Sequence, residues 1–251
     1  MNESYFNNRY IRQSTFPPIG EKGQGMLAKS RVALIGCGGL GSSIASNLVR
    51  SGVGFLRIVD NDVLEISNIH RQCLYNEEDL KRNIPKVFIA KEKLNLINST
   101  VNIEAINQRA NDENMEIITE EIDIVLDGTD NFQTRFLINK ACIKKLIPWI
   151  FGSAAGSNGM VFNIIPKKTP CFACLFSEAP STEFAETSVN AGILNTIVNT
   201  IAAIQSTEAI KYLTGNENTL LKGLLFIDLW DLSFVTTNIK KPVDFRCPVC
   251  E

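Results

Sequence analysis

The sequence predicts an α/β protein with a mostly parallel sheet that is flanked by helices and continues into a late antiparallel portion. A β-branched run at 32–35 is followed at once by the glycine-rich loop GCGGLG at 36–41 and then by a helical pattern. Short apolar runs alternate with helical patterns through the first half of the chain, which is typical of a doubly wound, Rossmann-like sheet. After Gly159 the apolar runs surround a single long helical segment, so we expect the sheet to end differently from how it begins.

The strands expected in the first half are 32–35, 55–59, 101–106, 122–126 and 147–151, and the later ones are 160–165, 224–227 and 234–237. Helices are expected from the glycine loop to about Arg50, from about Pro85 onward, over 132–145 and over about 193–213. Pro85 suits a first helical turn because that position needs no backbone donor. The stretch between Cys174 and Gly192 is rich in Ser, Thr, Glu and Pro, which indicates a surface loop and a candidate lid or partner-binding crossover.

Composition excludes several classes of protein. The 251 residues are 45% hydrophobic and 21% charged, which suits one globular domain over 1–251. A net charge of -2 offers no clustered basic face, so we expect no nucleic-acid partner. The polar N-terminus lacks the apolar core of a signal peptide, and polar residues interrupt the apolar segment 193–210, so we expect no membrane span and a cytosolic protein.

The glycine loop predicts a nucleotide-phosphate site. Glycine allows the backbone to turn sharply and to approach a phosphate closely, and the helix that follows offers free N–H groups to the anion. Asp60 ends the second expected strand, where an acid accepts hydrogen bonds from ribose hydroxyls. The loop alone is shared by NAD, FAD, SAM and ATP binders, and its simplest alternative is a tight turn in an unrelated α/β fold. The loop positions we expect at the nucleotide are Gly36, Gly38, Gly39 and Gly41.

Residues after Asp60 turn this prediction toward Mg·ATP. Arginine and lysine near a phosphate loop neutralise a triphosphate, and an aspartate at the carboxyl end of a strand can hold Mg²⁺. A nicotinamide dehydrogenase would need neither. Taken singly, these residues have simpler readings: Asn68 as a helix cap, Asp130 as a cap of the helix that follows it, and Lys86 as a solvated lysine in a first helical turn. The set comprises Ser67, Asn68, Arg71, Lys86, Asp130 and Asn131.

Four of the seven cysteines form two CxxC pairs, Cys171 with Cys174 and Cys247 with Cys250. Four thiolates at this spacing predict a tetrahedral structural Zn²⁺ site with no open position. Redox-active pairs and unpaired thiols are the alternatives. Of the other three, Cys37 and Cys142 fit packing positions, and the pattern does not decide whether Cys73 has a covalent role.

Taken together, these motifs resemble the E1-like adenylyltransferases of the MoeB/ThiF/HesA group, which are relatives of the ubiquitin-activating enzymes. The resemblance covers essentially the whole chain. The matching elements, in family order, are RYIRQ at 9–13, the loop 36–41, SGVG at 51–54, Asp60, SNIHRQ at 67–72, PKV at 85–87, DGTDN at 127–131 and the two CxxC pairs.

The resemblance implies a homodimer that binds Mg·ATP and a MoaD/ThiS-like ubiquitin-like sulfur-carrier protein. The carrier's C-terminal Gly-Gly carboxylate would attack the α-phosphate and release pyrophosphate, for molybdenum-cofactor or thiamine synthesis. By this resemblance Gly39 and Asp60 hold the nucleotide, while Asn68, Arg71 and Lys86 contact phosphates. Asp130 binds Mg²⁺, and Arg12 reaches the neighbouring subunit's phosphates. An ionised carboxylate needs no general base, which agrees with a chain that contains one histidine.

The resemblance also divides the chain into an N-terminal helical arm at 1–30, a nucleotide-binding half at 31–152 and a carrier-binding half at 153–251 with a crossover loop at about 175–191. Ser188 stands where some members carry a nucleophilic cysteine, so we expect no thioester on this loop. The segment 77–84 is longer than the family pattern, which makes Lys81 an alternative to Lys86. Other functions left open are adenylation of a peptide C-terminus, a dehydrogenase with structural zinc and a non-catalytic binding module.

Overall fold

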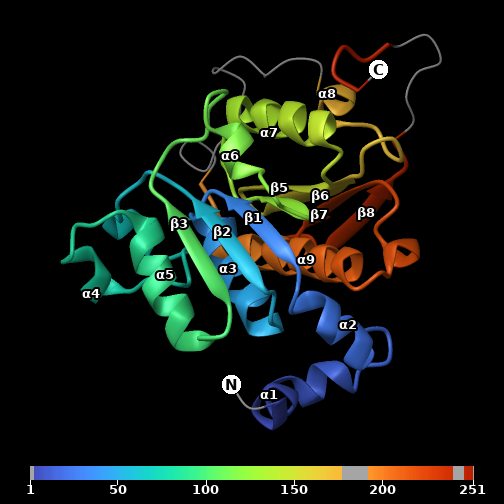
Figure 1. The fold of residues 1–251 in the computed structure, drawn as a ribbon. Coiled ribbons are helices and arrows are strands. Elements are labelled where there is room, and N and C mark those ends of the chain that lie inside the picture. The colour runs from blue at the N-terminus through green and yellow to red at the C-terminus, as the bar shows by residue number, and fades with distance from the viewer. Residues whose placement is uncertain (1–2, 177–191, 240–245, 251) are drawn as a thin grey trace.

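The structure is a computed structural model that describes residues 3–176, 192–239 and 246–250. Most of the expected crossover loop, Ser188 included, lies outside these residues. Two helices, α1 (Glu3–Ser14) and α2 (Gly20–Leu27), lead into an eight-stranded sheet with the strand order β3-β2-β1-β4-β5-β6-β7-β8 (Figure 1). Both halves of the chain contribute strands to this one sheet. Within the described residues, no helix is long and apolar enough to cross a membrane.

The first five strands are parallel, and the last three join them antiparallel, as the sequence predicted. Because β2 and β4 flank β1 on opposite sides, the strand order reverses at β1, and a crevice forms at the carboxyl ends there. The strands are β1 (Arg31–Ile35), β2 (Phe55–Val59), β3 (Asn102–Ile106), β4 (Ile124–Asp127), β5 (Trp149–Ala155), β6 (Asn158–Ile164), β7 (Leu224–Asp228) and β8 (Ser233–Thr237).

Helices cover both faces of the sheet and enclose two separate apolar cores (Figure 1). In β1, Val32 and Leu34 belong to one core, whereas Ala33 and Ile35 belong to the other, because successive side chains of a strand point to opposite faces. The first core packs under α3 (Gly39–Ser51), α5 (Lys86–Ile97) and α9 (Asn195–Leu213); the second packs under α6 (Met115–Ile118), α7 (Phe132–Lys145) and α8 (Phe172–Leu175).

The expected strands and long helices are all present, with ends shifted by a few residues. The prediction for Pro85 was wrong by one position: it precedes α5 as the N-cap with an extended ψ of 139°, because it forms a β-bridge with Val63. The short helices α4 (Glu77–Leu80), α6 and α8 and the 3-10 turns η1 (Ile66–Asn68) and η2 (Glu217–Thr219) were not predicted, since so few residues carry no hydrophobic period.

Candidate active site

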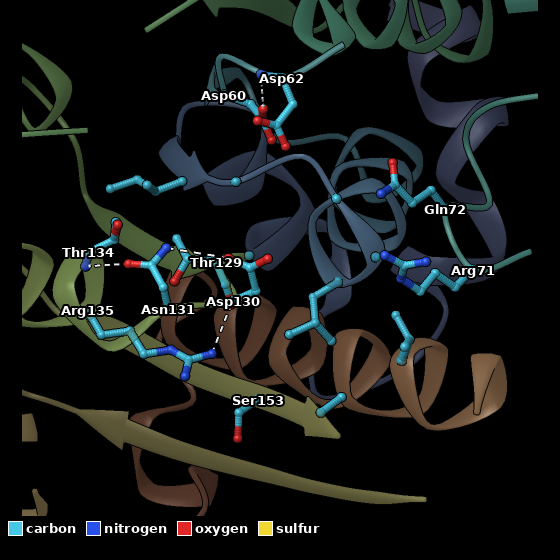
Figure 2. Close-up of a pocket in the computed structure, with 18 of the residues that line it drawn as sticks. Asp60, Asp62, Arg71, Gln72, Thr129, Asp130, Asn131, Thr134, Arg135 and Ser153 are labelled. Carbon is cyan, nitrogen blue, oxygen red and sulfur yellow. Dashed lines mark hydrogen bonds between the residues drawn. The ribbon is translucent and has the colours of Figure 1, made fainter. Parts of the chain in front are cut away.

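A cavity of about 1380 Å³ opens at the carboxyl ends of β1, β2 and β4, where the strand order reverses. Most of the residues that the sequence predicted to contact the nucleotide lie in its wall (Figure 2). From that set, the wall includes Gly36, Gly38, Gly39, Asp60, Asn68, Arg71, Lys86, Asp130 and Asn131. The exceptions are Arg12, Gly41 and Ser67, which do not line this cavity.

The four loop glycines divide into two roles. Gly36 has φ +90°, and a Cβ there would lie 2.5 Å from the carbonyl oxygen of Gly128. A Cβ on Gly41 would collide with the Gly36 carbonyl oxygen, so these two glycines let the β1–α3 and β4–α7 connections pack together. Gly38 and Gly39, which line the cavity together with Gly36, lie where the 13-residue helix α3 begins. The free N–H groups of a helix N-terminus favour an anion at this point.

Asp60 is tied to the glycine loop. Its Oδ2 accepts a hydrogen bond from the Cys37 N–H at 2.7 Å, and its Oδ1 accepts one from the Asp62 N–H at 2.8 Å. Burial raises the pKa of Asp60, while these two hydrogen bonds and the charge of Lys86 act in the opposite direction. The carboxyl group is therefore held in one position at the end of β2.

The geometry favours Lys86 over Lys81 as the cavity's lysine. The Lys86 side chain is 5% exposed, and its Nζ lies 3.1 Å from Oδ2 of Asp62. Lys81 is 70% exposed and pairs with Glu78, and it is not among the residues of the cavity wall. A buried ammonium group beside a single exposed carboxylate is well placed to meet a further anion.

The turn η1 and the residues after it carry Asn68 and Arg71. The Arg71 guanidinium donates through Nη1 to the Ser67 carbonyl at 2.7 Å, which leaves other N–H groups to face the cavity. Asn68 also acts in a capping box, because its Oδ1 accepts the Glu65 N–H at 3.2 Å. The Ser67 hydroxyl donates to the Glu65 carboxylate at 3.2 Å.

Asp130 and Asn131 follow β4. The alternative reading, that Asp130 caps the following helix, is wrong, because Oδ1 of Asn131 accepts the Thr134 N–H at 2.9 Å and caps α7. Aspartate and asparagine both suit an N-cap position, but α7 begins at Phe132, one residue later than a cap at Asp130 would require. Asp130 belongs to the cavity wall, where Figure 2 shows it beside Asn131.

A buried ion pair, which the sequence analysis missed, braces the loop that carries Asp130. Nε of Arg135 donates to Oδ2 of Asp127 at 2.9 Å, and its Nη2 donates to the carbonyls of Thr129 (2.9 Å) and Gly152 (3.2 Å). Burial raises the pKa of Asp127, whereas Arg135 stabilises its charged form. An aspartate at the end of an apolar strand signals that a partner is needed, but not which residue supplies it.

Arg12 is exposed near the end of α1, away from this chain's own cavity. Its helix is held against the end of α3: Nε2 of Gln13 donates to the Ser51 carbonyl at 2.8 Å. Gly52 packs directly against the Tyr10 ring, because a Cβ on Gly52 would lie 2.5 Å from Cζ of Tyr10. The RYIRQ and SGVG motifs therefore meet in space, and their contact fixes the helix that bears Arg12.

The four paired cysteines form one cluster. Their sulfur atoms all lie within 4.8 Å of one another, with Cys171 3.8 Å from Cys174 and 3.6 Å from Cys247, and with Cys174 3.6 Å from Cys250. These distances are far longer than a disulfide bond of about 2.05 Å. They match the roughly 3.8 Å edge of a tetrahedron with Zn–S bonds of about 2.3 Å. The donor set and its geometry fit a zinc ion.

The other cysteines lie elsewhere. Cys37 and Cys142 are fully buried, in agreement with packing roles, and burial raises the pKa of the Cys37 thiol to about 12. The Tyr75 hydroxyl donates to the Cys37 sulfur at 3.0 Å. Cys73 is exposed, and its sulfur lies 3.2 Å from the Ser43 hydroxyl.

The site combines the glycine loop and Asp60 with two cations, Arg71 and Lys86, and a second acid, Asp130. This combination, at the point where the strand order of the mixed sheet reverses, is that of an E1-like adenylyltransferase. The chain belongs to the ThiF family, whose sequence model matches residues 10–249.

Relatives cover nearly the whole chain. It is 38% identical over 243 residues to the sulfur carrier protein ThiS adenylyltransferase of Bacillus subtilis. The aligned residues cover 96% of this chain and 71% of that protein. It is 34% identical over 248 residues to the sulfur carrier protein adenylyltransferase of Thermus thermophilus, and the alignment covers 97% of this chain and 90% of that protein. A crystal structure of E. coli MccB with ATP superposes with a TM-score of 0.82 at 25% identity, covering 100% of this chain and 76% of that one.

Proposed function

We propose that this protein adenylates the C-terminal Gly-Gly carboxylate of a small ubiquitin-like sulfur-carrier protein, using Mg·ATP and releasing pyrophosphate. The observation that carries the proposal is the composition of the cavity wall: a phosphate-binding glycine loop beside Arg71 and Lys86, with Asp130 also in the wall. The relatives named as sulfur carrier protein adenylyltransferases support this choice of substrate. The name of the Bacillus relative includes ThiS, which favours a carrier of the ThiS kind.

The residues of the wall suit this reaction. A carboxylate oxygen of the carrier attacks the α-phosphorus, the bond from that phosphorus to the α,β-bridging oxygen breaks, and pyrophosphate leaves with the electron pair. The nucleophile is already ionised, so the protein has to position the two substrates and neutralise charge. Arg71 and Lys86 would bind the phosphates, and Asp130 would hold Mg²⁺, which prefers oxygen ligands and screens the departing pyrophosphate.

The cavity continues along β5 and β6, where small residues, among them Ser153, Ala154 and Gly159, line it together with Phe151 and Met160. These small residues leave room for the extended Gly-Gly tail of a carrier. At its other end the cavity reaches Phe226 on β7, which is 40% exposed. Further exposed apolar side chains follow on and between β7 and β8, namely Trp230 (79%), Leu232 (74%), Phe234 (59%) and Val235 (53%). Val235 pairs with Phe226 and shares its face of the sheet, whereas Phe234 points to the other face. We place the carrier's folded body on the face that Phe226 and Val235 share, because Phe226 also lines the cavity.

A homodimer, a structural zinc ion and a cytosolic location complete the proposal. Because Arg12 does not line its own chain's cavity, a second copy would have to supply it. Cytosolic thiols stay reduced, which keeps the cysteine cluster available for zinc.

Adenylation of a peptide C-terminus is the second candidate, and the similarity to MccB favours it. One MccB structure contains ATP, and another is a complex with N-formylated MccA. Identity to MccB is 25%, whereas identity to the Bacillus carrier adenylyltransferase is 38%. We therefore rank the carrier protein first.

Exchange of labelled pyrophosphate into ATP tests the proposal. Exchange should require a carrier with an intact Gly-Gly end and should stop when the last glycine is removed. Arg71→Ala should slow it by about 10²-fold or more, as for other arginines in phosphoryl transfer. Exchange that needs no carrier, or that Arg71→Ala leaves unchanged, would contradict the assignment.

A further inference from the structure

Gln72 is a buried glutamine in the cavity wall whose side chain has no hydrogen-bond partner among the described residues. It is 3% exposed, and its Oε1 is buried without a partner. Its backbone, in contrast, bonds normally within the turn, because the Gln72 N–H donates to the Asn68 carbonyl at 2.9 Å. Leaving a buried amide oxygen unpaired is unfavourable, and buried polar groups are satisfied in most proteins. Packing alone would be served better by an apolar residue.

The orientation of the Gln72 amide indicates the kind of group that it binds. Nε2 of Gln72 is the heavy atom nearest to the place of a Cβ on Gly38, at 3.7 Å. Figure 2 shows the nitrogen end of the side chain turned toward the glycine loop, with the oxygen end turned away. The positive end of the amide dipole therefore points to the same place as the free N–H groups of α3.

Gln72 and Arg71 each lie close to one glycine of the loop, Gln72 to Gly38 and Arg71 to Gly39. Two carbons of the Arg71 side chain lie 3.8 Å from the place of a Cβ on Gly39, one residue along the loop from Gly38. Consecutive residues after η1 thus stand over consecutive glycines at the start of α3. One of them brings a charged donor to the anion site, and the other brings a neutral donor.

We propose that Gln72 is a phosphate-binding residue, whose Nε2 donates a hydrogen bond to a phosphate oxygen of the nucleotide at the glycine loop. The inference rests on the nucleotide site of the proposed function and does not depend on which carrier is adenylated. Because the Gln72 side chain is buried, its neutral Nε2 group would donate in one fixed direction and would add no charge. It would therefore fix the position of the phosphate relative to Arg71.

Calorimetric titration with Mg·ATP and, separately, with adenosine tests this proposal. Gln72→Ala should weaken ATP binding by about 10-fold or more, as expected for a hydrogen bond to a charged group, and should leave adenosine binding unchanged. Gln72→Glu, which keeps the shape but replaces the donor with a carboxylate, should weaken ATP binding further than alanine does. Gln72→Met, which keeps the length without polar atoms, should resemble alanine and guards against a folding defect in the smaller variant.

Cys73→Ser is the matched control, because this neighbouring residue is exposed and outside the cavity wall, and it should bind both ligands as the wild type does. The proposal is overturned if Gln72→Ala binds ATP normally, or if adenosine loses as much affinity as ATP does. The two proposals fail separately. Selective loss of ATP affinity in a protein that adenylates no carrier would support the role of Gln72 while rejecting the proposed substrate.

Discussion

Replacing Arg135 with leucine should leave a buried carboxylate without its partner beneath the Asp130 loop. Asp127 is fully buried and the Arg135 side chain is 6% exposed, so water cannot take over the lost contacts. Removing one partner of such a pair costs about 3–5 kcal/mol. Each kcal/mol lowers the melting temperature by roughly 2–4 °C in a chain of this size, so we expect a decrease of roughly 6–20 °C.

The loss should depend on pH, with a sign that follows from Asp127. Burial already raises the pKa of this carboxyl, and without Arg135 the folded-state pKa should rise further. A group whose pKa is raised by folding adds no penalty below its unfolded pKa, about 3.9 for aspartate, and destabilises increasingly as pH rises through the folded-state pKa. The gap in unfolding free energy between variant and wild type should therefore be widest at neutral to alkaline pH and should narrow as the medium is acidified.

Urea unfolding over a pH series measures this gap. The double variant Arg135→Leu/Asp127→Leu removes both charges, so its stability should recover toward the wild type, and its difference from the wild type should vary with pH less than that of Arg135→Leu does. A loss for Arg135→Leu that is below about 1 kcal/mol, or that is equal at every pH, would refute the reasoning that a stranded buried charge causes it.

Three further perturbations probe the site, the dimer and the metal. Lys86→Ala should slow pyrophosphate exchange by about 10²-fold, while the control Lys81→Ala, which removes only a surface pair, should change it less than about twofold; equal effects would reject Lys86 as the phosphate ligand. Mixing inactive Arg12→Ala and Lys86→Ala subunits should restore about a quarter of wild-type exchange, since about half of all dimers are mixed and each mixed dimer keeps one intact site of two; no recovery would place Arg12 outside the partner's site. Metal analysis should return one zinc per chain, and Cys174→Ser should lose it and unfold roughly 6–12 °C lower; a metal-free wild type would remove the zinc assignment.

Local patterns were enough to predict the parts of the site that lie at strand ends. The glycine loop and Asp60 each follow directly from an apolar strand, and the carboxyl ends of parallel strands meet at one edge of a sheet. The fold class was predictable for the same reason, because a period of two or 3.6 residues is a property of a short stretch of sequence.

Roles that depend on distant partners were not predictable in this way. Nε2 of Gln205 donates to the Asp127 carbonyl at 2.9 Å, and these residues are 78 positions apart in the chain. The unpaired amide of Gln72 is defined by what surrounds it, which a sequence motif does not state. The choice between Asp130 and Asn131 as the helix cap likewise depended on where α7 begins, since both side chains can accept the same backbone hydrogen bonds.

Mass spectrometry of the carrier after incubation with the protein and Mg·ATP tests the central claim most directly. The proposal predicts a carrier that gains one adenylyl group at its C-terminal carboxylate, in step with the release of pyrophosphate, and that gains nothing when the terminal glycine is missing. Release of ADP instead of pyrophosphate, or a carrier of unchanged mass under conditions in which ATP is consumed, would contradict it.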